Sequence, residues 1–361
     1  MHPSLDIILC ALLRVGLGLS SEFPYTLSEK EWQSLFLMAK QQTVQGVAFD
    51  ALSRLPAETR PPRLLVMKLV GPNEAIHGLN KVMNQEAARY TKLFAERGAR
   101  SVILKGQANA RLYPNPLSRQ AGDIDIWVPG GYDKVERLLL DMGLITEGKR
   151  SYRASRHIGF RSKNGIEIEV HYRPAETPFR NKELQEFFDT EFDNSTLTPE
   201  GFYSPSIRFA LVMQLQHLYR HCIKTGVGLR HCMDYFMLLR HSTAADREFA
   251  WKKIKRFGLG HAGASVMWAL GEIFGLPREQ MLCPPDKVRG LRMYREILNG
   301  GNFGRNAEHN KNSHSSLKRK LRKRMYALSW LFVDPLYVAL SELQSWKQAV
   351  ILFFTRCPKK R

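Results

Sequence analysis

The order of apolar and polar positions divides the chain into helical and sheet-forming stretches. A helical period runs through residues 32–39 and again through residues 86–97. Ser28 stands three residues before Glu31, which is the spacing of a capping box at the start of a helix. These patterns predict a helical region over residues 1–95.

The apolar period then changes to that of β-strands. Residues 101–105 form a short β-branched run, and residues 123–128 alternate apolar with polar side chains. Two further strand patterns, at 158–163 and 166–172, flank Asn164-Gly165, a dipeptide that favours a tight hairpin turn. Because helical patterns lie between these strands, we expect a small mixed unit of the α+β class.

This organisation predicts four consecutive segments. They are an N-terminal helical region (1–95), a mixed core that carries the chemistry (96–200), a helical domain that closes the cleft (201–298) and a basic linker with a C-terminal amphipathic segment (299–361). The expected fold is therefore α+β (mixed), with a small mixed sheet flanked by N-terminal and C-terminal helical regions.

The composition is that of a globular chain with an excess of positive charge. Among 361 residues, 44% are hydrophobic and 24% are charged, which excludes a collagen-like, disordered or polytopic membrane protein. The net charge is +20, and residues 301–361 carry half of it, with 13 Lys and Arg against 3 Asp and Glu. Such an excess predicts polyanionic partners, namely nucleotides, nucleic acid or an anionic membrane face.

The cysteine pattern and the length of the apolar runs indicate the cellular compartment of the protein. The five cysteines include no CxxC pair, so we expect neither disulfides nor a zinc ribbon. No apolar run reaches the length of a membrane span, and no basic n-region precedes the apolar start of the chain. We therefore expect a cytoplasmic protein.

The strongest candidates for metal-binding residues are Asp123 and Asp125. Side chains at positions i and i+2 of a strand leave the same face, so the two carboxylates should point together. They repel each other unless a cation compensates them, and hard oxygen ligands of this kind suit Mg²⁺ or Mn²⁺. Two solvated aspartates on a half-exposed strand are the alternative interpretation.

A third carboxylate comes from a later strand pattern. In Glu167-Ile-Glu169-Val-His171 the two glutamates and the histidine share one face. If this strand lies beside the aspartate strand, three carboxylates can hold two divalent ions. We favour Glu169 as the third ligand, with Glu167 as its rival; the polar face of an exposed hairpin is the alternative.

Lys105, Gly106 and Arg119 are candidates for phosphate binding. Gly106 follows a predicted strand, and a glycine there lets phosphate oxygens approach the backbone where a helix begins. Lys105 and Arg119 could supply the cationic partners that a triphosphate needs, and Arg119 would do so with a bidentate fork. Each cation could equally be a solvated side chain.

The chain resembles an uncharacterised bacterial nucleotidyltransferase family of the DNA polymerase β-like superfamily, and the likeness covers most of its length. The shared motifs are Leu104-Lys-Gly106, Tyr113-Pro, Arg119, Asp123-Ile-Asp125, Glu169-Val-His171, Gly226-Val-Gly-Leu-Arg230 and Asp234-Tyr. The chain departs from the broader superfamily at Gln107, where a serine is usual, and in the long gap between Gly106 and Asp123.

The resemblance implies a nucleotidyltransferase-type sheet and an Mg²⁺-dependent enzyme, with Mn²⁺ as the other candidate ion. Such an enzyme moves a nucleoside monophosphate from NTP to a hydroxyl acceptor, here a small molecule, glycan, protein or RNA, and releases pyrophosphate. The implied catalytic metal ligands are Asp123, Asp125 and Glu169, the implied nucleotide-binding residues are Lys105, Gly106 and Arg119, and the cleft would be lined by His171, Arg230 and Asp234. Arg230 and Asp234 could also be an ordinary helical i, i+4 pair.

Other functions stay open. The basic run at residues 318–324 precedes an apolar stretch with aromatic residues, and residues 318–361 could therefore contact nucleic acid or an anionic membrane. One alternative is a catalytically silent nucleotide- or RNA-binding module. Another is a peripheral membrane protein of envelope polysaccharide metabolism. Histidines at 217, 221 and 231 with neighbouring cysteines could bind zinc, although their spacing matches no zinc motif.

Overall fold

A five-stranded mixed sheet with the strand order β1-β2-β5-β4-β3 lies at the centre of the computed structural model, which describes residues 3–146, 152–153, 156–301 and 316–356. The strands are β1 (Val102–Ile103), β2 (Ile124–Trp127), β3 (Tyr152–Arg153), β4 (His157–Arg161) and β5 (Glu167–His171). A separate pair consists of β6 (Thr196–Leu197) and β7 (Tyr203–Ser204).

The pairing of the central strands decides which polar side chains meet. β2 and β5 are parallel, and Asp125 lies opposite Glu169. β4 and β5 are antiparallel, and His157 lies opposite His171. The turn between them contains Gly165 with a φ of 75°, a left-handed conformation that glycine adopts without strain. The predicted hairpin is confirmed.

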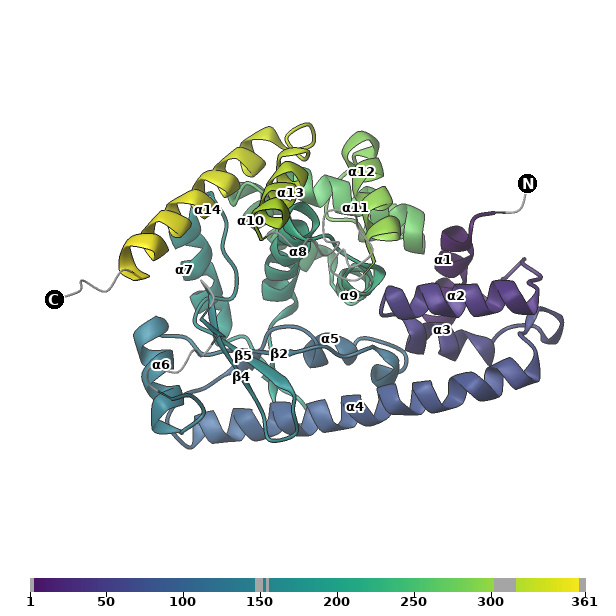
Figure 1. Ribbon diagram of the computed structural model, residues 1–361, viewed down its shortest axis with the longest axis horizontal. Coiled ribbons are helices and arrows are strands. Elements are labelled where there is room, and N and C mark those ends of the chain that lie inside the picture. The colour runs from purple at the N-terminus through teal and green to yellow at the C-terminus, as the bar shows by residue number, and fades with distance from the viewer. Residues whose placement is uncertain (1–2, 147–151, 154–155, 302–315, 357–361) are drawn as a thin grey trace.

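Helices cover the sheet on two sides. The N-terminal helices are α1 (Leu5–Gly16), α2 (Glu29–Gln41) and α3 (Gln45–Leu52), and a single long helix, α4 (Arg63–Ala95), follows them. Ser28 and Glu31 form the predicted capping box of α2. Figure 1 shows α4 running along one side of the molecule, past the sheet.

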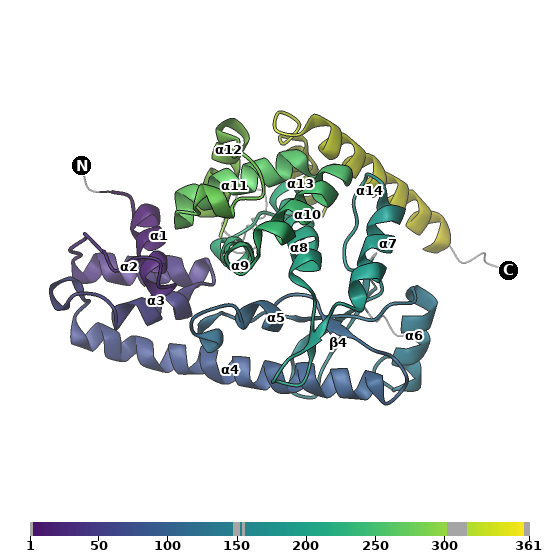
Figure 2. The same cartoon turned by 180° about the vertical axis from the view of Figure 1, so that it is seen from behind.

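The remaining helices lie mostly on the opposite side of the sheet from α4, as Figure 2 shows from behind. They are α5 (Gln107–Ala110), α6 (Tyr132–Asp141), α7 (Asn181–Phe192), α8 (Ile207–Lys224), α9 (Leu229–Arg240), α10 (Ala244–Arg256), α11 (Gly260–Phe274), α12 (Lys287–Gly300), α13 (Ser316–Leu328) and α14 (Pro335–Arg356), with short 3-10 turns η1 (Ala57–Thr59), η2 (Pro116–Ser118) and η3 (Arg278–Gln280). Among the described residues, no helix is long and apolar enough to cross a membrane.

Two clusters of buried apolar side chains hold these layers together. The smaller cluster joins the sheet to α4 through residues such as Ile126, Ile168 and Tyr90. The larger one joins α1–α3 to the helices from α8 onward, and Arg14 of α1 donates from Nε to the carbonyl oxygen of Ile273 in α11 at 2.9 Å. The α+β class with a small mixed sheet and helical flanks is confirmed. The division into four segments stays a prediction.

Candidate active site

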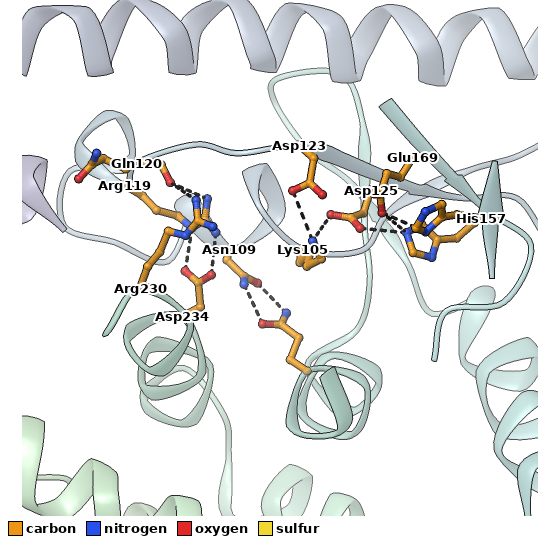
Figure 3. Close-up of polar contacts among 12 residues, drawn as sticks. Lys105, Asn109, Arg119, Gln120, Asp123, Asp125, His157, Glu169, Arg230 and Asp234 are labelled. Atoms are coloured by element: carbon orange, nitrogen blue, oxygen red, sulfur yellow. Dashed lines mark hydrogen bonds and ion pairs between the residues drawn. The ribbon is translucent and has the colours of Figure 1, made fainter. Parts of the chain in front are cut away.

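Three carboxylates meet where β2 and β5 run side by side (Figure 3). Asp125 lies in β2, Glu169 faces it from β5, and Asp123 immediately precedes β2. One oxygen atom from each of these carboxylates lies within 4.8 Å of the other two. Ile124 and Ile126 alternate with the aspartates and are buried in the sheet core, so the packing of the sheet fixes the acidic face. We call Asp123, Asp125 and Glu169 the acidic triad.

Of the two candidate glutamates, the structure brings Glu169 to the aspartates. Glu167 stands at the start of β5 and is exposed. Burial raises the pKa of Glu169; a hydrogen bond from His171 opposes this rise in pKa, and the negative charge of Asp125 adds to it. The triad is therefore a place where negative charges repel and a cation would be stabilised.

Lys105 lies between the two aspartates. Its Nζ contacts the Asp125 carboxylate directly and lies 3.6 Å from Asp123 Oδ1. Burial acts to lower the pKa of Lys105, but the charges of the triad hold this pKa above its usual value. Burial likewise acts to raise the pKa of Asp125, yet Lys105 and His171 hold it well below its usual range. The ammonium group thus provides the compensating charge for the aspartates.

Two histidines border the triad on the side away from β1. His171 Nε2 lies 2.9 Å from Asp125 Oδ1 and 3.4 Å from Glu169 Oε2. His157 Nδ1 lies 3.0 Å from that same Glu169 oxygen. Burial and the nearby His171 lower the pKa of His157 to about 3, so its ring is neutral. Sequence reasoning missed His157, because only the pairing of β4 with β5 places it beside His171.

Gly106 lies beside the acidic triad at the end of β1. It precedes α5 with φ 65° and ψ −107°, a combination that is strained for any residue with a side chain. A Cβ atom added there would lie 3.6 Å from the carbonyl oxygen of Asp123. The side chain of Gln107 turns away and donates to Asn84 Oδ1 of α4 at 2.6 Å. The backbone of Gly106 thus lies close to the backbone of Asp123, the residue that precedes β2.

Arg119 lies apart from the triad, in an ion pair with Asp234 of α9. Its Nε and Nη2 donate to the two carboxylate oxygens, each at 2.7 Å, and the hydroxyl of Tyr113 donates to Asp234 Oδ1, also at 2.7 Å. Both members of the pair are buried. The guanidinium of Arg119 is thus bound to Asp234. A contact between Arg119 and a nucleotide stays a prediction.

Arg230 connects α9 to the loop before β2. Its Nη1 donates to the carbonyl oxygen of Gln120 at 3.1 Å, and a Cβ atom added at Gly122 would lie 3.2 Å from that nitrogen. Burial and the nearby Arg119 lower the pKa of Arg230. Arg230 and Asp234, one turn apart on α9, thus both hold the segment that leads into Asp123.

Three histidines of α8 and α9 lie close to one another. The ring centroids of His217 and His221 are 4.4 Å apart, and His231 lies 6.1 Å from each. Burial and nearby charges lower the pKa of all three rings. Among the described residues, the groups with ligand atoms close enough for a metal ion are the triad and the set His157, Glu169 and His171. His217, His221 and His231 belong to neither of these two groups.

The described cysteines are all free thiols in the protein interior. Cys10, Cys222, Cys232 and Cys283 are buried and form no disulfide, and burial raises the pKa of each thiol. Buried thiols of raised pKa are poor nucleophiles and poor metal ligands. Cys357 lies outside the described residues.

Comparison of the chain with known proteins identifies the family to which it belongs. The family model described as "Uncharacterised nucleotidyltransferase" matches residues 28–275, which is more than half of the chain and includes the triad, Lys105 and Asp234. A search of curated proteins finds no match. The extent of the family match shows that the chain belongs to this uncharacterised nucleotidyltransferase family.

Proposed function

We propose that the protein is an Mg²⁺-dependent nucleotidyltransferase that moves a nucleoside monophosphate from NTP to a hydroxyl acceptor and releases pyrophosphate. Membership of the family supports nucleotidyl transfer in general. The observation that carries the finer proposal is the convergence of three carboxylate oxygens within 4.8 Å on neighbouring strands. A module that only bound nucleotide anions would be weakened by such a cluster of negative charge.

The donor atoms of the triad fit a hard divalent cation. All three ligands are carboxylate oxygens, and Asp123 and Glu169 remain partly exposed, so the site can be reached from solvent. Mg²⁺ prefers carboxylates together with substrate phosphate oxygens, and Mn²⁺ accepts the same ligands. A bound ion would favour the deprotonated acceptor oxygen and neutralise charge on the phosphates.

The chain's own residues would position the groups and move the proton. Glu169, which faces Asp125 from β5, accepts the proton of the acceptor hydroxyl as the new oxygen–phosphorus bond forms and the bond to pyrophosphate breaks. Lys105, on the β1 side, donates to the phosphates of the leaving group. His171 contacts both Asp125 and Glu169 and so keeps the two carboxylate groups close to each other.

Incorporation of labelled NTP into an acceptor fraction tests this function. With Mg²⁺ and a cell lysate as the source of acceptor, the wild-type protein should incorporate label from at least one of the four NTPs. Asp125→Asn should lower the rate by about 100-fold or more, the cost of disturbing a catalytic metal site. Asp193→Asn, at a residue whose side chain is 86% exposed, should react at the wild-type rate.

Two results would contradict the proposal: no Mg²⁺-dependent incorporation by the wild-type protein, or equal rates for wild type and Asp125→Asn. Tight nucleotide binding without turnover would support the silent binding module instead. The acceptor would be identified from the labelled product.

The exposed side chains of α13, α14 and the turn between them support a second proposal, that this surface contacts an anionic membrane. The large exposed apolar residues there are Leu321, Met325, Leu328, Phe332, Leu336, Leu343 and Trp346. Phe332 is 95% exposed, and the basic residues 322–324 of α13 precede it by eight to ten positions. Aliphatic side chains beside basic ones suit a lipid interface. RNA binding would use aromatic stacking platforms, whereas five of these seven exposed residues are aliphatic and Arg324 lies over the ring of Trp346 at 3.8 Å from its centroid.

Sedimentation with lipid vesicles tests the membrane contact. The protein should sediment with vesicles of phosphatidylglycerol and phosphatidylcholine, and much less with phosphatidylcholine alone. Phe332→Asp should reduce binding severalfold, whereas Leu197→Asp, at another exposed apolar residue, should not. Equal sedimentation of the two variants, or salt-sensitive binding to RNA but not to vesicles, would rule the contact out.

A further inference from the structure

Two histidines and a glutamate form a second group of candidate metal ligands beside the acidic triad. His157 stands in β4, and Glu169 and His171 stand in β5. One ligand atom from each residue lies within 4.8 Å of the other two. Glu169 belongs to both groups, whereas the two histidines are not members of the triad. We call His157, Glu169 and His171 the histidine group.

The register of β4 and β5 places these side chains on one face of the sheet. Glu169 and His171 are two positions apart in β5, and His157 lies directly opposite His171, so all three leave the sheet on the same side. The β4 residue opposite Glu169 is Gly159, which has no side chain. The ring of His157 therefore contacts Glu169 along this face without a β4 side chain directly opposite the glutamate (Figure 3).

The distances between the ligand atoms have the spacing of ligands around one ion. His157 Nδ1 lies 3.0 Å from Glu169 Oε2, and His171 Nε2 lies 3.4 Å from the same oxygen. Two ligands that are each about 2.1 Å from a metal ion are about 3.0 Å apart at a right angle and about 3.4 Å apart at the tetrahedral angle. Hydrogen bonds would have similar lengths, so the distances alone do not decide between an ion and a proton.

The contacts of His171 show that a positive centre is needed at its Nε2 atom. Its Nδ1 atom lies 3.4 Å from the carbonyl oxygen of Arg173, which can only accept a hydrogen bond, so the ring proton of a neutral His171 belongs on Nδ1. The Nε2 lone pair then faces carboxylate oxygens of Asp125 and Glu169 at 2.9 and 3.4 Å, and ionised carboxylates donate no proton. Either a second ring proton or a metal ion relieves this repulsion. Histidines that bind metals commonly donate their other N–H to a backbone carbonyl.

We propose that the histidine group binds a divalent transition-metal ion such as Zn²⁺, beside the acidic triad. Two imidazole nitrogens and one carboxylate oxygen suit Zn²⁺, whereas Mg²⁺ and Mn²⁺ prefer carboxylates and phosphates. The side chain of Glu169 is 17% exposed, so the ion can enter from solvent. The proposal goes beyond nucleotidyl transfer and does not depend on it.

The two metal sites can be occupied together, because a carboxylate has two oxygen atoms. Both histidine contacts are made to Oε2 of Glu169, which leaves Oε1 for the triad. The ammonium of Lys105 contacts Asp123 and Asp125, and among the described residues no hydrogen bond or ion pair joins it to the histidine group. The Zn²⁺ ion therefore does not have to displace this ammonium, and it should bind while Mg²⁺ is present.

Competition for Zn²⁺ between the protein and a chromophoric chelator, with Mg²⁺ in large excess, tests the site. The untagged, full-length wild-type protein should bind one Zn²⁺ ion. His157→Gln should weaken Zn²⁺ binding at least tenfold and keep the affinity for Mn²⁺. Asp123→Asn, at a triad residue outside the histidine group, should weaken Mn²⁺ binding and keep the affinity for Zn²⁺. His217→Gln is the matched control, since His217 is partly buried and belongs to neither group; it should bind Zn²⁺ as wild type.

Wild-type Zn²⁺ affinity in folded His157→Gln, or loss of Zn²⁺ binding in His217→Gln, would overturn the inference. No Zn²⁺ binding by the wild-type protein would also overturn it, and would indicate a second proton on His171. Melting curves show whether each variant is folded. X-ray absorption of the Zn²⁺-loaded wild-type protein needs no variant: it should show two imidazole nitrogens about 2.0–2.1 Å from the ion, and coordination by oxygen alone would contradict the site. All these measurements report metal binding, so an inactive transferase would leave the inference standing.

Discussion

Arg119 and Asp234 form a buried bidentate ion pair that joins the loop before β2 to α9. Both donor–acceptor distances are 2.7 Å, and 115 positions separate the two residues in the chain. The loop runs directly from Arg119 to Asp123, so the pair fixes the first residue of the acidic triad relative to the helices above the sheet.

The pair should make a large contribution to stability. Asp234→Ala leaves the guanidinium of Arg119 and the hydroxyl of Tyr113 buried without their acceptor, and should lower the free energy of unfolding by about 3–5 kcal/mol. Urea denaturation measures this loss. Asp193→Ala removes the partner of an exposed ion pair with Arg100 and should cost less than about 1 kcal/mol. Similar losses in the two variants would show that burial of the Arg119 pair does not matter.

A side chain at position 106 should destabilise the protein, because of the backbone conformation there. Its φ of 65° and ψ of −107° would strain an alanine, so Gly106→Ala should lower the free energy of unfolding by about 1–3 kcal/mol. Gly78→Ala is the matched control, since Gly78 lies in the interior of α4 with no atom within 4 Å of an added Cβ; it should stabilise the protein by up to about 1 kcal/mol. A neutral Gly106→Ala would contradict the strained conformation.

The histidines of α8 should make stability depend on pH. Burial and the charge of Arg220 lower the pKa of His221 to about 3, whereas an unfolded histidine has a pKa near 6.5. Below about pH 6.5 the unfolded chain binds a proton that the native protein excludes, so stability falls as the pH falls toward about 3. This ring contributes a slope of up to about 1.4 kcal/mol per pH unit. His221→Gln should reduce the slope of unfolding free energy against pH, whereas His241→Gln at the surface should leave it unchanged.

Much of the acidic site follows from local rules of the sequence. The period of two placed Asp123 and Asp125 on one face, and the Asn164-Gly165 turn gave the hairpin that ends in β5. The parallel pairing of β5 with β2, which places Glu169 opposite Asp125, has no signature in the local sequence, because strand order depends on contacts between distant segments. Both the strand pattern and the family resemblance favour Glu169 as the third ligand, with Glu167 as its rival.

The rest depends on tertiary contacts that leave no local pattern. The sequence predicted a helix over 86–97, but α4 begins at Arg63 and continues through Pro72, where its packing against α3 and the sheet outweighs the lost hydrogen bond. His157 reaches Glu169 only because β4 pairs with β5. The partner of Arg119 stands on another helix, so its ion pair could not be read from spacing.

Lys105 should contribute most to the stability of the protein when no divalent ion is bound. Lys105→Met removes the ammonium that compensates Asp125 and leaves the aspartate in a buried site with less positive charge around it. The melting temperature in EDTA should fall by several degrees, and Mg²⁺ should restore more of it than in the wild-type protein. A Mg²⁺ response no larger than that of the wild type would show that the ammonium and the ion do not compensate the same charges.

Divalent-ion binding to the acidic triad is the most direct test of the proposed enzyme. Titration with Mn²⁺, read by the loss of free Mn²⁺ signal in electron paramagnetic resonance and by the melting temperature, should show binding by the wild-type protein that NTP strengthens. At ten times Kd the ion should stabilise the fold by about 1.4 kcal/mol. Glu167→Gln, on the same strand but outside the triad, should bind Mn²⁺ as wild type, whereas Asp125→Asn and Glu169→Gln should lose binding. Wild-type Mn²⁺ affinity in Asp125→Asn, or no binding by the wild-type protein with or without NTP, would contradict the account.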